Sequence, residues 1–419
     1  MERALLVTIR LNSEKGSWRL EDTAQELEEL TRSCQAEIVD NITAVLEKPT
    51  PNLFIGKGKA EEIALLCQEE NADTVIFSHD LSGTQQRNLE ENVGRKAIDR
   101  TQLILDIFAQ HAKSPEGKTQ VELAQLEYLL PRLVGKGIML SRLGGGIGTR
   151  GPGEQKLEVD RRRIRKRIEK LQNDLKRVSL HRQVLRKKRK ENLTAAVAVV
   201  GYTNAGKSTL INALTGAGQF VQDSLFTTLD PLSKSLRLPN GEGVVISDTV
   251  GFLHNLPHHL IEAFKATLEE VAEADLLIHV LDVSHPRVHE HARAVAAVLR
   301  ELGADKIPTI TALNKIDLVD DQIWLSRLSQ DFPNPVLISA KLNRNLNILI
   351  EKIQNNFQSR MVSLTLAVPL ARMDLINLFY RQGRVEEIKY LPSGIKVTVT
   401  LPITLIPNLL KNKEVKKLD

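Results

Sequence analysis

A glycine-containing loop between a predicted strand and a predicted helix constrains this chain more than any other stretch. The loop comprises Gly201, Tyr202, Thr203, Asn204, Ala205, Gly206, Lys207, Ser208 and Thr209. The valine-rich apolar run 194–200 precedes it and predicts a buried strand, and a helix is expected to begin near Lys207. Strand, loop and helix in this order are typical of a phosphate-binding loop, and an ordinary glycine turn explains the pattern much less well. We therefore expect an α/β domain with a nucleotide at this loop.

The residue types in the loop fit the chemistry of a bound triphosphate. Gly201 and Gly206 allow the backbone to curl until its N–H groups point inward. Lys207 would supply a cation to the β and γ phosphates, and the Ser208 hydroxyl would be a ligand of Mg²⁺.

A second motif predicts which base is bound. Asn314, Lys315, Ile316 and Asp317 follow the apolar run 308–313. The Asp317 carboxylate could accept hydrogen bonds from N1–H and the exocyclic amine of guanine, whereas adenine presents an acceptor at N1 and would leave it unpaired. The base is therefore expected to be guanine. The base pocket would be completed by three residues after the strand-like run 336–338, namely Ser339, Ala340 and Lys341.

Two further segments are expected to sense the γ phosphate. One follows the predicted strand 244–246 and consists of Asp248, Thr249, Val250 and Gly251. Asp248 would hold Mg²⁺ through water, and the Gly251 N–H would contact the γ phosphate. The other is a loop containing Phe226, Thr227, Thr228, Leu229 and Asp230. Because Thr228 would bind Mg²⁺ only while the γ phosphate is present, we expect a conformational switch.

Position 252 bears on catalysis. Phe252 stands where many small GTPases carry the glutamine that orients the attacking water, and phenylalanine cannot do this. The water would then be positioned by backbone groups, a cation, another side chain or a partner, and intrinsic turnover should be slow. Asn204 is a candidate for binding K⁺ beside the phosphates, or else a simple turn former. The predicted catalytic groups are Lys207, Thr228, Gly251 and Asn204 through K⁺.

The charge of the chain is concentrated in one segment. Residues 156–190 contain 16 Lys and Arg against 4 Asp and Glu, a local net charge of +12, although the whole chain of 419 residues carries only +5. No apolar run reaches the roughly 18 residues of a membrane span. Cys34 and Cys67 lack metal-ligand spacing, so a cytoplasmic protein with reduced thiols is expected.

The rest of the chain predicts three further domains around the nucleotide domain at 193–360. Residues 1–112 alternate strand-like and helix-like stretches, as in a small parallel α/β domain. Within them, Gly56, Lys57, Gly58 and Lys59 could contact phosphate, but a loop leading into a helix is the simpler interpretation. Residues 113–192 predict a helical hairpin, and 361–419 a small α+β domain whose role is not readable.

The hairpin prediction rests on two apolar seams and a glycine-rich turn. Leu123, Leu126 and Leu130 would pack against the heptad-like series Ile164, Ile168, Leu171, Leu175 and Val178. Between the seams, glycines permit close approach to a crowded surface and arginines can pair with phosphate. We therefore expect RNA contacts, with a solvated basic face as the alternative. The predicted RNA-binding residues are Arg142, Gly144, Gly145, Gly146, Arg150, Arg161, Arg162 and Arg163.

Three histidines near the nucleotide site, His254, His258 and His259, suggest a metal or a general base. They have no carboxylate or cysteine at ligand spacing, which favours surface or RNA-facing side chains.

These motifs together resemble a known family. The stretch 143–154 followed by three arginines, with the segments 226–231 and 248–252 downstream, strongly resembles the HflX family of ribosome-associated GTPases over roughly residues 1–360. The resemblance implies a GTPase, with Mg²⁺ as cofactor, that binds the large ribosomal subunit. It also implies that the glycine-rich tip reaches toward the peptidyl transferase centre and that the protein splits stalled or idle ribosomes. We expect a cytoplasmic, partly ribosome-associated monomer.

The sequence also allows two other functions. One is an RNA-binding or RNA-remodelling factor with ATPase activity in the N-terminal domain and a merely regulatory GTP site. The other is a purely structural ribosome-associated protein, which would show no stimulated hydrolysis.

Overall fold

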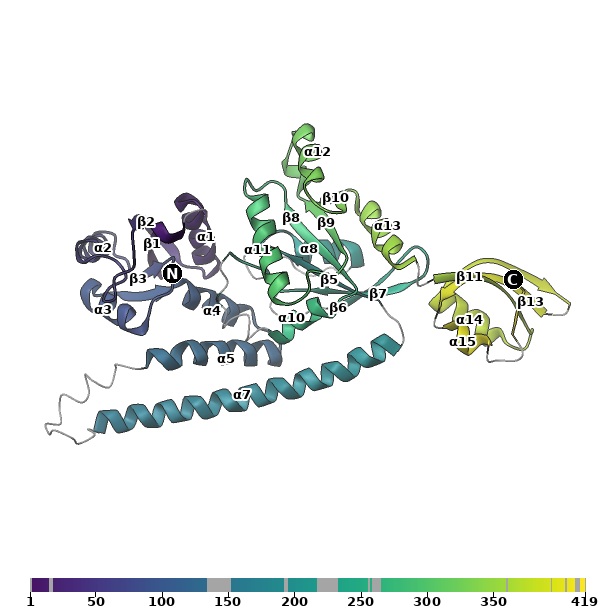
Figure 1. The fold of residues 1–419 in the computed structure, drawn as a ribbon, viewed down its shortest axis with the longest axis horizontal. Coiled ribbons are helices and arrows are strands. Elements are labelled where there is room, and N and C mark those ends of the chain that lie inside the picture. Colours follow the sequence, from purple (N-terminus) through teal and green to yellow (C-terminus); the bar gives the residue numbers. More distant parts are fainter. Residues whose placement is uncertain are drawn as a thin grey trace. The chain divides into compact units, whose positions relative to one another are not determined.

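The computed structural model describes residues 2–14, 18–133, 152–191, 195–216, 233–254, 257, 265–358, 361–392, 394–403, 405–410 and 415–418 (Figure 1). These residues divide into two compact units. One holds the chain up to Val178, and the other holds most of the chain from Ser179 onward. The predicted switch residues Phe226, Thr227, Thr228, Leu229 and Asp230 lie outside the described residues. So do Arg142, Gly144, Gly145, Gly146, Arg150, His258 and His259.

The first unit contains a parallel sheet in the order β2-β1-β3-β4. Apolar residues on β1 and β3, such as Leu5, Val7 and Val75, are fully buried, as expected for parallel strands covered by helices. The small parallel α/β domain predicted from the alternating pattern is therefore confirmed. Its elements are β1 (Arg3–Leu11), η1 (Asn12–Glu14), α1 (Leu20–Ser33), β2 (Glu37–Leu46), α2 (Lys57–Glu69), β3 (Thr74–Phe77), α3 (Gly83–Val93), β4 (Lys96–Asp99) and α4 (Arg100–His111).

Two helices follow, α5 (Pro115–Arg132) and the 40-residue α7 (Pro152–Glu191), and they lie side by side in Figure 1. Leu123, Ile168 and Leu171 form a buried cluster, against which Leu126, Leu130, Ile164 and Leu175 pack. The predicted seam is thus observed as far as Leu175, whereas this cluster of described residues does not include Val178, the last predicted member. An ion pair between Arg167 Nε and Glu122 Oε1 (2.6 Å) borders it. The rest of α7 is mainly polar, and Arg162 and Arg163 are exposed.

The second unit contains a six-stranded sheet in the order β10-β9-β8-β5-β7-β6, in which only β6 runs antiparallel to its neighbour. Helices cover it, so its central strands are apolar on both faces. The elements are β5 (Ala195–Gly201), α8 (Lys207–Thr215), β6 (Ser233–Arg237), β7 (Gly243–Asp248), α10 (Lys265–Ala272), β8 (Leu276–Asp282), α11 (Val288–Glu301), β9 (Thr309–Asn314), η2 (Ile316–Leu318), α12 (Gln322–Gln330), β10 (Pro335–Leu337) and α13 (Leu346–Phe357).

The C-terminal segment forms a sheet in the order β12-β13-β11-β14 with two helices, which agrees with the predicted α+β domain. Leu366, Phe379, Val397 and Val399 lie in its own buried core. Two short elements were not predicted, α15 (Leu405–Leu410) and β14 (Lys416–Lys417). The others are β11 (Met361–Val368), α14 (Met373–Gln382), β12 (Arg384–Leu391) and β13 (Gly394–Pro402).

Candidate nucleotide site

The two glycines of the loop between β5 and α8 lie where the structure leaves no room for a side chain. Gly206 has φ +93°, and a Cβ at this position would lie 2.3 Å from Asn314 Nδ2. At Gly201 a Cβ would lie 2.4 Å from the Val280 carbonyl oxygen of the adjacent strand. Both positions therefore exclude a side chain, Gly206 also by conformation.

Lys207, the first residue of α8, turns its amino group back into this loop. Its side chain is buried, and Nζ donates hydrogen bonds to the carbonyl oxygens of Tyr202 (2.9 Å) and Gly201 (3.2 Å). Burial lowers the pKa of Lys207 to about 8, although the negative charge of Asp248 acts in the opposite direction. A buried ammonium group gains most from an anion placed beside it. The loop can therefore hold a phosphate with this side chain.

The two predicted magnesium ligands that the structure describes are neighbours. Ser208 Oγ donates a hydrogen bond to Asp248 Oδ2 at 2.7 Å, although the residues are 40 positions apart in sequence. Asp248 is buried at the end of β7, and its Oδ1 accepts from the Thr249 N–H (3.0 Å). A hydroxyl and a carboxylate oxygen are the hard ligands that Mg²⁺ prefers. These two residues thus fit a magnesium ion.

The segment after Asp248 runs alongside the loop. The Phe252 N–H donates to the Gly201 carbonyl oxygen (3.1 Å), and the Thr203 N–H donates to the Phe252 carbonyl oxygen (2.9 Å). A Cβ on Gly251 would lie 3.1 Å from Lys207 Nζ, so this glycine sits beside the buried amino group. The Phe252 side chain is 1% exposed and is part of the core. It therefore does not face a reacting water.

Asn314, the last residue of β9, joins two loops of the site. Its Nδ2 donates to the Ala205 carbonyl oxygen and its Oδ1 accepts from the Ala340 N–H, both at 2.9 Å. Lys315 has φ +67°, and its Nζ pairs with Asp282 Oδ2 at 2.7 Å. The structure thereby brings the motifs around residues 201–209, 314–317 and 339–341 to one edge of the sheet, where doubly wound sheets bind ligands.

Two polar atoms at this edge are buried without a hydrogen-bond partner among the described residues. They are Asp317 Oδ1 and Thr203 Oγ1. A buried acceptor or hydroxyl that lacks a partner is costly, so such atoms are expected where a ligand completes the bonding. Asp317 Oδ1 is an acceptor, as recognition of guanine requires. Thr203 belongs to the phosphate loop and lies beside Gly251 of the segment after β7.

Sequence reasoning missed three residues near this site. Asp282 forms the ion pair with Lys315. It is the last residue of an apolar strand, as Asp248 is, and this position could have marked it as a site residue. His279 is buried on β8, and burial together with the charge of Lys207 lowers its pKa to about 4. His291 of α11 stacks on Tyr202, with ring centroids 3.8 Å apart. Nothing in the local pattern signals this contact.

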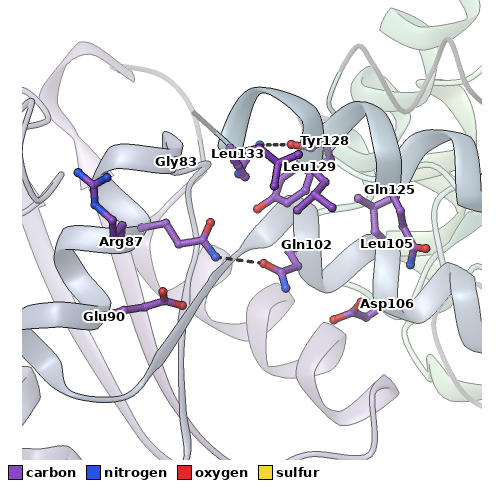
Figure 2. A pocket seen from close by; sticks show the side chains of 12 residues that line it. Gly83, Arg87, Glu90, Gln102, Leu105, Asp106, Gln125, Tyr128, Leu129 and Leu133 are labelled. Carbon is purple, nitrogen blue, oxygen red and sulfur yellow. Dashed lines mark hydrogen bonds between the residues drawn. The ribbon is translucent and has the colours of Figure 1, made fainter. Parts of the chain in front are cut away.

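A separate cavity of about 420 Å³ lies within the first unit, between α3, α4 and α5. Figure 2 shows Gln102 and Asp106 of α4 facing it, with Tyr128 of α5 at its border. Gln86 Nε2 donates to Gln102 Oε1 at 3.3 Å. None of the predicted phosphate contacts at Gly56–Lys59 lines this cavity; that stretch instead begins α2, with Gly56 as N-cap.

No group of His, Cys, Asp and Glu that could hold a metal is found among the described residues. Within the part of the chain that is described, His254 therefore does not belong to a metal-binding group. Within the same residues, none of the helices combines the length and apolar character needed to cross a bilayer.

Three family models match the chain. Residues 21–109 match the GTP-binding GTPase N-terminal model, residues 111–189 the GTP-binding GTPase middle region, and residues 196–315 the model described as 50S ribosome-binding GTPase. Among solved structures, a GTP-binding protein from the hyperthermophilic archaeon Sulfolobus solfataricus in complex with GDP is 25% identical. It covers 86% of this chain and 99% of its own, with a TM-score of 0.45.

Curated relatives are similar over nearly the whole chain. GTPase HflX of Caldanaerobacter subterraneus subsp. tengcongensis is 48% identical, over 94% of this chain and 90% of the relative. GTPase HflX of Escherichia coli K12 is 42% identical, over 96% and 94%. This chain therefore belongs to the HflX family of GTPases, and the reaction it catalyses is the hydrolysis of GTP.

Proposed function

We propose that this chain uses GTP to control its binding to the large ribosomal subunit, and that it splits stalled or idle ribosomes. The observation that supports this most is the single cluster of Lys207, Ser208, Asp248 and Asn314 at one sheet edge, in a chain that also carries the basic helix α7 with exposed arginines at 162 and 163. The first group would hold GTP with Mg²⁺. The arginines of α7, with the glycine-rich stretch 143–153, would contact ribosomal RNA near the peptidyl transferase centre.

In this proposal the nucleotide site consists of the residues predicted above. Lys207 neutralises phosphate charge, Ser208 and Asp248 hold Mg²⁺ with Thr228, and Asp317 reads guanine. Mg²⁺ supplies charge neutralisation between the β and γ phosphates when bound. The segments 1–112, 113–192, 193–360 and 361–419 act as successive modules, and the protein works as a monomer at the ribosome.

GTP hydrolysis can control ribosome binding only if the GTP and GDP states of the protein differ in their affinity for the large subunit. GTP orders the segments around Thr228 and Gly251, and that state binds the large subunit more tightly than the GDP state does. A nucleotide with equal affinity for both states would shift nothing. Hydrolysis then weakens binding and releases the protein.

The test is GTP turnover and large-subunit binding measured on one preparation. We expect large subunits to accelerate turnover, and a non-hydrolysable GTP analogue to favour the complex over GDP. Deletion of residues 143–153 should abolish subunit binding while basal turnover persists. Equal binding of the GTP-analogue and GDP forms would contradict the proposal.

The same assay addresses potassium. Asn204 is exposed in the phosphate loop with φ +58°, a conformation in which asparagine is common. We propose that it helps bind K⁺ beside the phosphates. Turnover should then be faster in K⁺ than in Na⁺ at equal ionic strength, and Asn204→Ala should remove the difference. Equal rates in both salts would leave Asn204 as a turn former.

The alternative is an RNA-remodelling factor driven by ATP in the N-terminal domain. The observation that favours this alternative is the 420 Å³ cavity, which lies between α3 and α4 of that domain and α5 of the hairpin. It predicts ATP turnover that persists in Lys207→Ala, whereas the main proposal predicts loss of GTP-dependent subunit binding in the same variant.

A further inference from the structure

Tyr202 occupies a special place in the phosphate loop. It follows Gly201 directly, and its side chain is only 5% exposed. Its ring lies parallel to that of His291 in α11, with centroids 3.8 Å apart and an interplanar angle of 1°. The His291 ring also lies against that of His285, with 4.4 Å between the centroids. The phenol ring is therefore fixed by packing, so its hydroxyl has a defined direction.

The hydroxyl of Tyr202 contacts the segment that follows Gly251. The His254 N–H donates a hydrogen bond to Tyr202 Oη at 2.9 Å. Two more bonds join the same two segments, from the Phe252 N–H to the Gly201 carbonyl oxygen and from the Thr203 N–H to the Phe252 carbonyl oxygen. Those two involve only backbone atoms, so any residue at position 202 would retain them. The third requires a phenol.

Residues 251–254 are thus attached to the phosphate loop at both sides of Phe252. Gly251, whose N–H is expected to meet the γ phosphate, lies immediately before the first attachment and beside Lys207 Nζ. Its position depends on how firmly the following residues are held. Because GDP has no γ phosphate, losing the hydrogen bond to Tyr202 should affect GTP and leave GDP binding unchanged.

We propose that Tyr202 is a positioning residue for GTP hydrolysis, whose hydroxyl, oriented by the stack on His291, holds residues 252–254 so that the Gly251 N–H faces the γ phosphate. This rests on the nucleotide site proposed above. The stacked imidazole is neutral, because burial lowers the pKa of His291 to about 3, and the nearby charges of His285, Arg287 and His254 act in the same direction. A neutral ring can stack on the phenol without needing a counter-ion.

The test compares Tyr202→Phe with the wild-type full-length chain. The variant keeps the ring and its stack and loses only the hydroxyl. We expect kcat for GTP to fall about fivefold, as for the loss of one net hydrogen bond, with GDP affinity unchanged. Hydrogen exchange of the backbone amides at 252–254 should become faster with the GTP analogue bound. Tyr390→Phe, which removes a hydroxyl from an exposed tyrosine, is the matched control and should change none of these quantities.

A second variant, His291→Ala, removes the stack while keeping the hydroxyl. This variant should also have a lower kcat. The double variant with Tyr202→Phe should lower kcat by less than the product of the two single-variant factors, because both changes act through the same hydrogen bond. Unchanged kcat and exchange in Tyr202→Phe would overturn the proposal. So would an equal loss of GDP and GTP-analogue affinity, which indicates general support of the loop. A wild-type chain that binds no guanine nucleotide would instead overturn the site itself.

Discussion

Replacing Asn314 by alanine is expected to be among the most damaging single changes in the second unit. The side chain is 2% exposed and makes two hydrogen bonds of 2.9 Å, one to the Ala205 carbonyl oxygen and one from the Ala340 N–H. Both partners are buried backbone groups, Ala205 in the phosphate loop and Ala340 after β10. Alanine would leave both without this partner.

The magnitude follows from the cost of a buried polar group left without a bond. Each group costs about 1–3 kcal/mol, so the two together predict a loss of roughly 3 kcal/mol in the free energy of unfolding. With a urea m-value of about 2 kcal/mol/M for a domain of this size, the midpoint of unfolding should fall by about 1.5 M. Nucleotide affinity should fall as well, because the bond to Ala205 shapes the loop.

The chain offers a domain-resolved probe for this measurement. It contains two tryptophans, Trp18 in the first unit and Trp324 in α12 of the second. In a Trp18→Phe background, fluorescence in urea reports the second unit alone. The matched control is Asn356→Ala, which removes an amide donor to a backbone carbonyl (Lys352, 3.0 Å) on the exposed face of α13. It should move the midpoint little. A similar shift in both variants would refute the reasoning.

Three further predictions concern binding. Asp317→Asn should shift preference from guanine toward xanthine nucleotides, measured by competition; unchanged selectivity for GTP would mean that the base pocket is misassigned. The pKa of Lys207 is lowered to about 8, and a bound phosphate favours the protonated amine. Calorimetry should therefore show that nucleotide affinity falls as the pH rises above about 8, and that binding there takes up a proton. An affinity that does not change with pH would contradict this. Reversing the charge of Arg161, Arg162 and Arg163 to Glu should weaken large-subunit binding and flatten its salt dependence, with basal GTP turnover unchanged.

The strand ends of the nucleotide site could be predicted because each follows an apolar run. β5, β7 and β9 end at Gly201, Asp248 and Asn314, the positions at which the motifs begin or end. The carboxyl ends of parallel strands meet at one edge, so the order of the motifs was enough to bring them together. The helical seam was predictable for a similar reason, since a 3–4 spacing of apolar residues on both helices specifies the contacting faces.

The partners of individual side chains could not be predicted. Local spacing says which face a residue occupies, but not which distant element lies opposite. Ser208 and Asp248 could be expected to lie close together because both were predicted to bind one magnesium ion. No shared chemical role predicts that Tyr202 stacks on His291. The two short C-terminal elements were missed because six and two residues carry too little periodicity.

Phe252 connects the fold of this chain to its chemistry. Burying a phenylalanine side chain stabilises a fold by about 1.5–3 kcal/mol, and here it fastens the segment after Gly251 to the core beside the phosphate loop. The side chain at this position is thus used for anchoring and cannot also reach a water at the γ phosphate. The backbone bonds around it keep Gly251 next to Lys207 even so. In the proposed function this site binds and senses the triphosphate, and orienting the attacking water falls to groups other than residue 252. That division of roles is the reason to expect slow hydrolysis by the isolated chain and faster hydrolysis on its ribosomal partner.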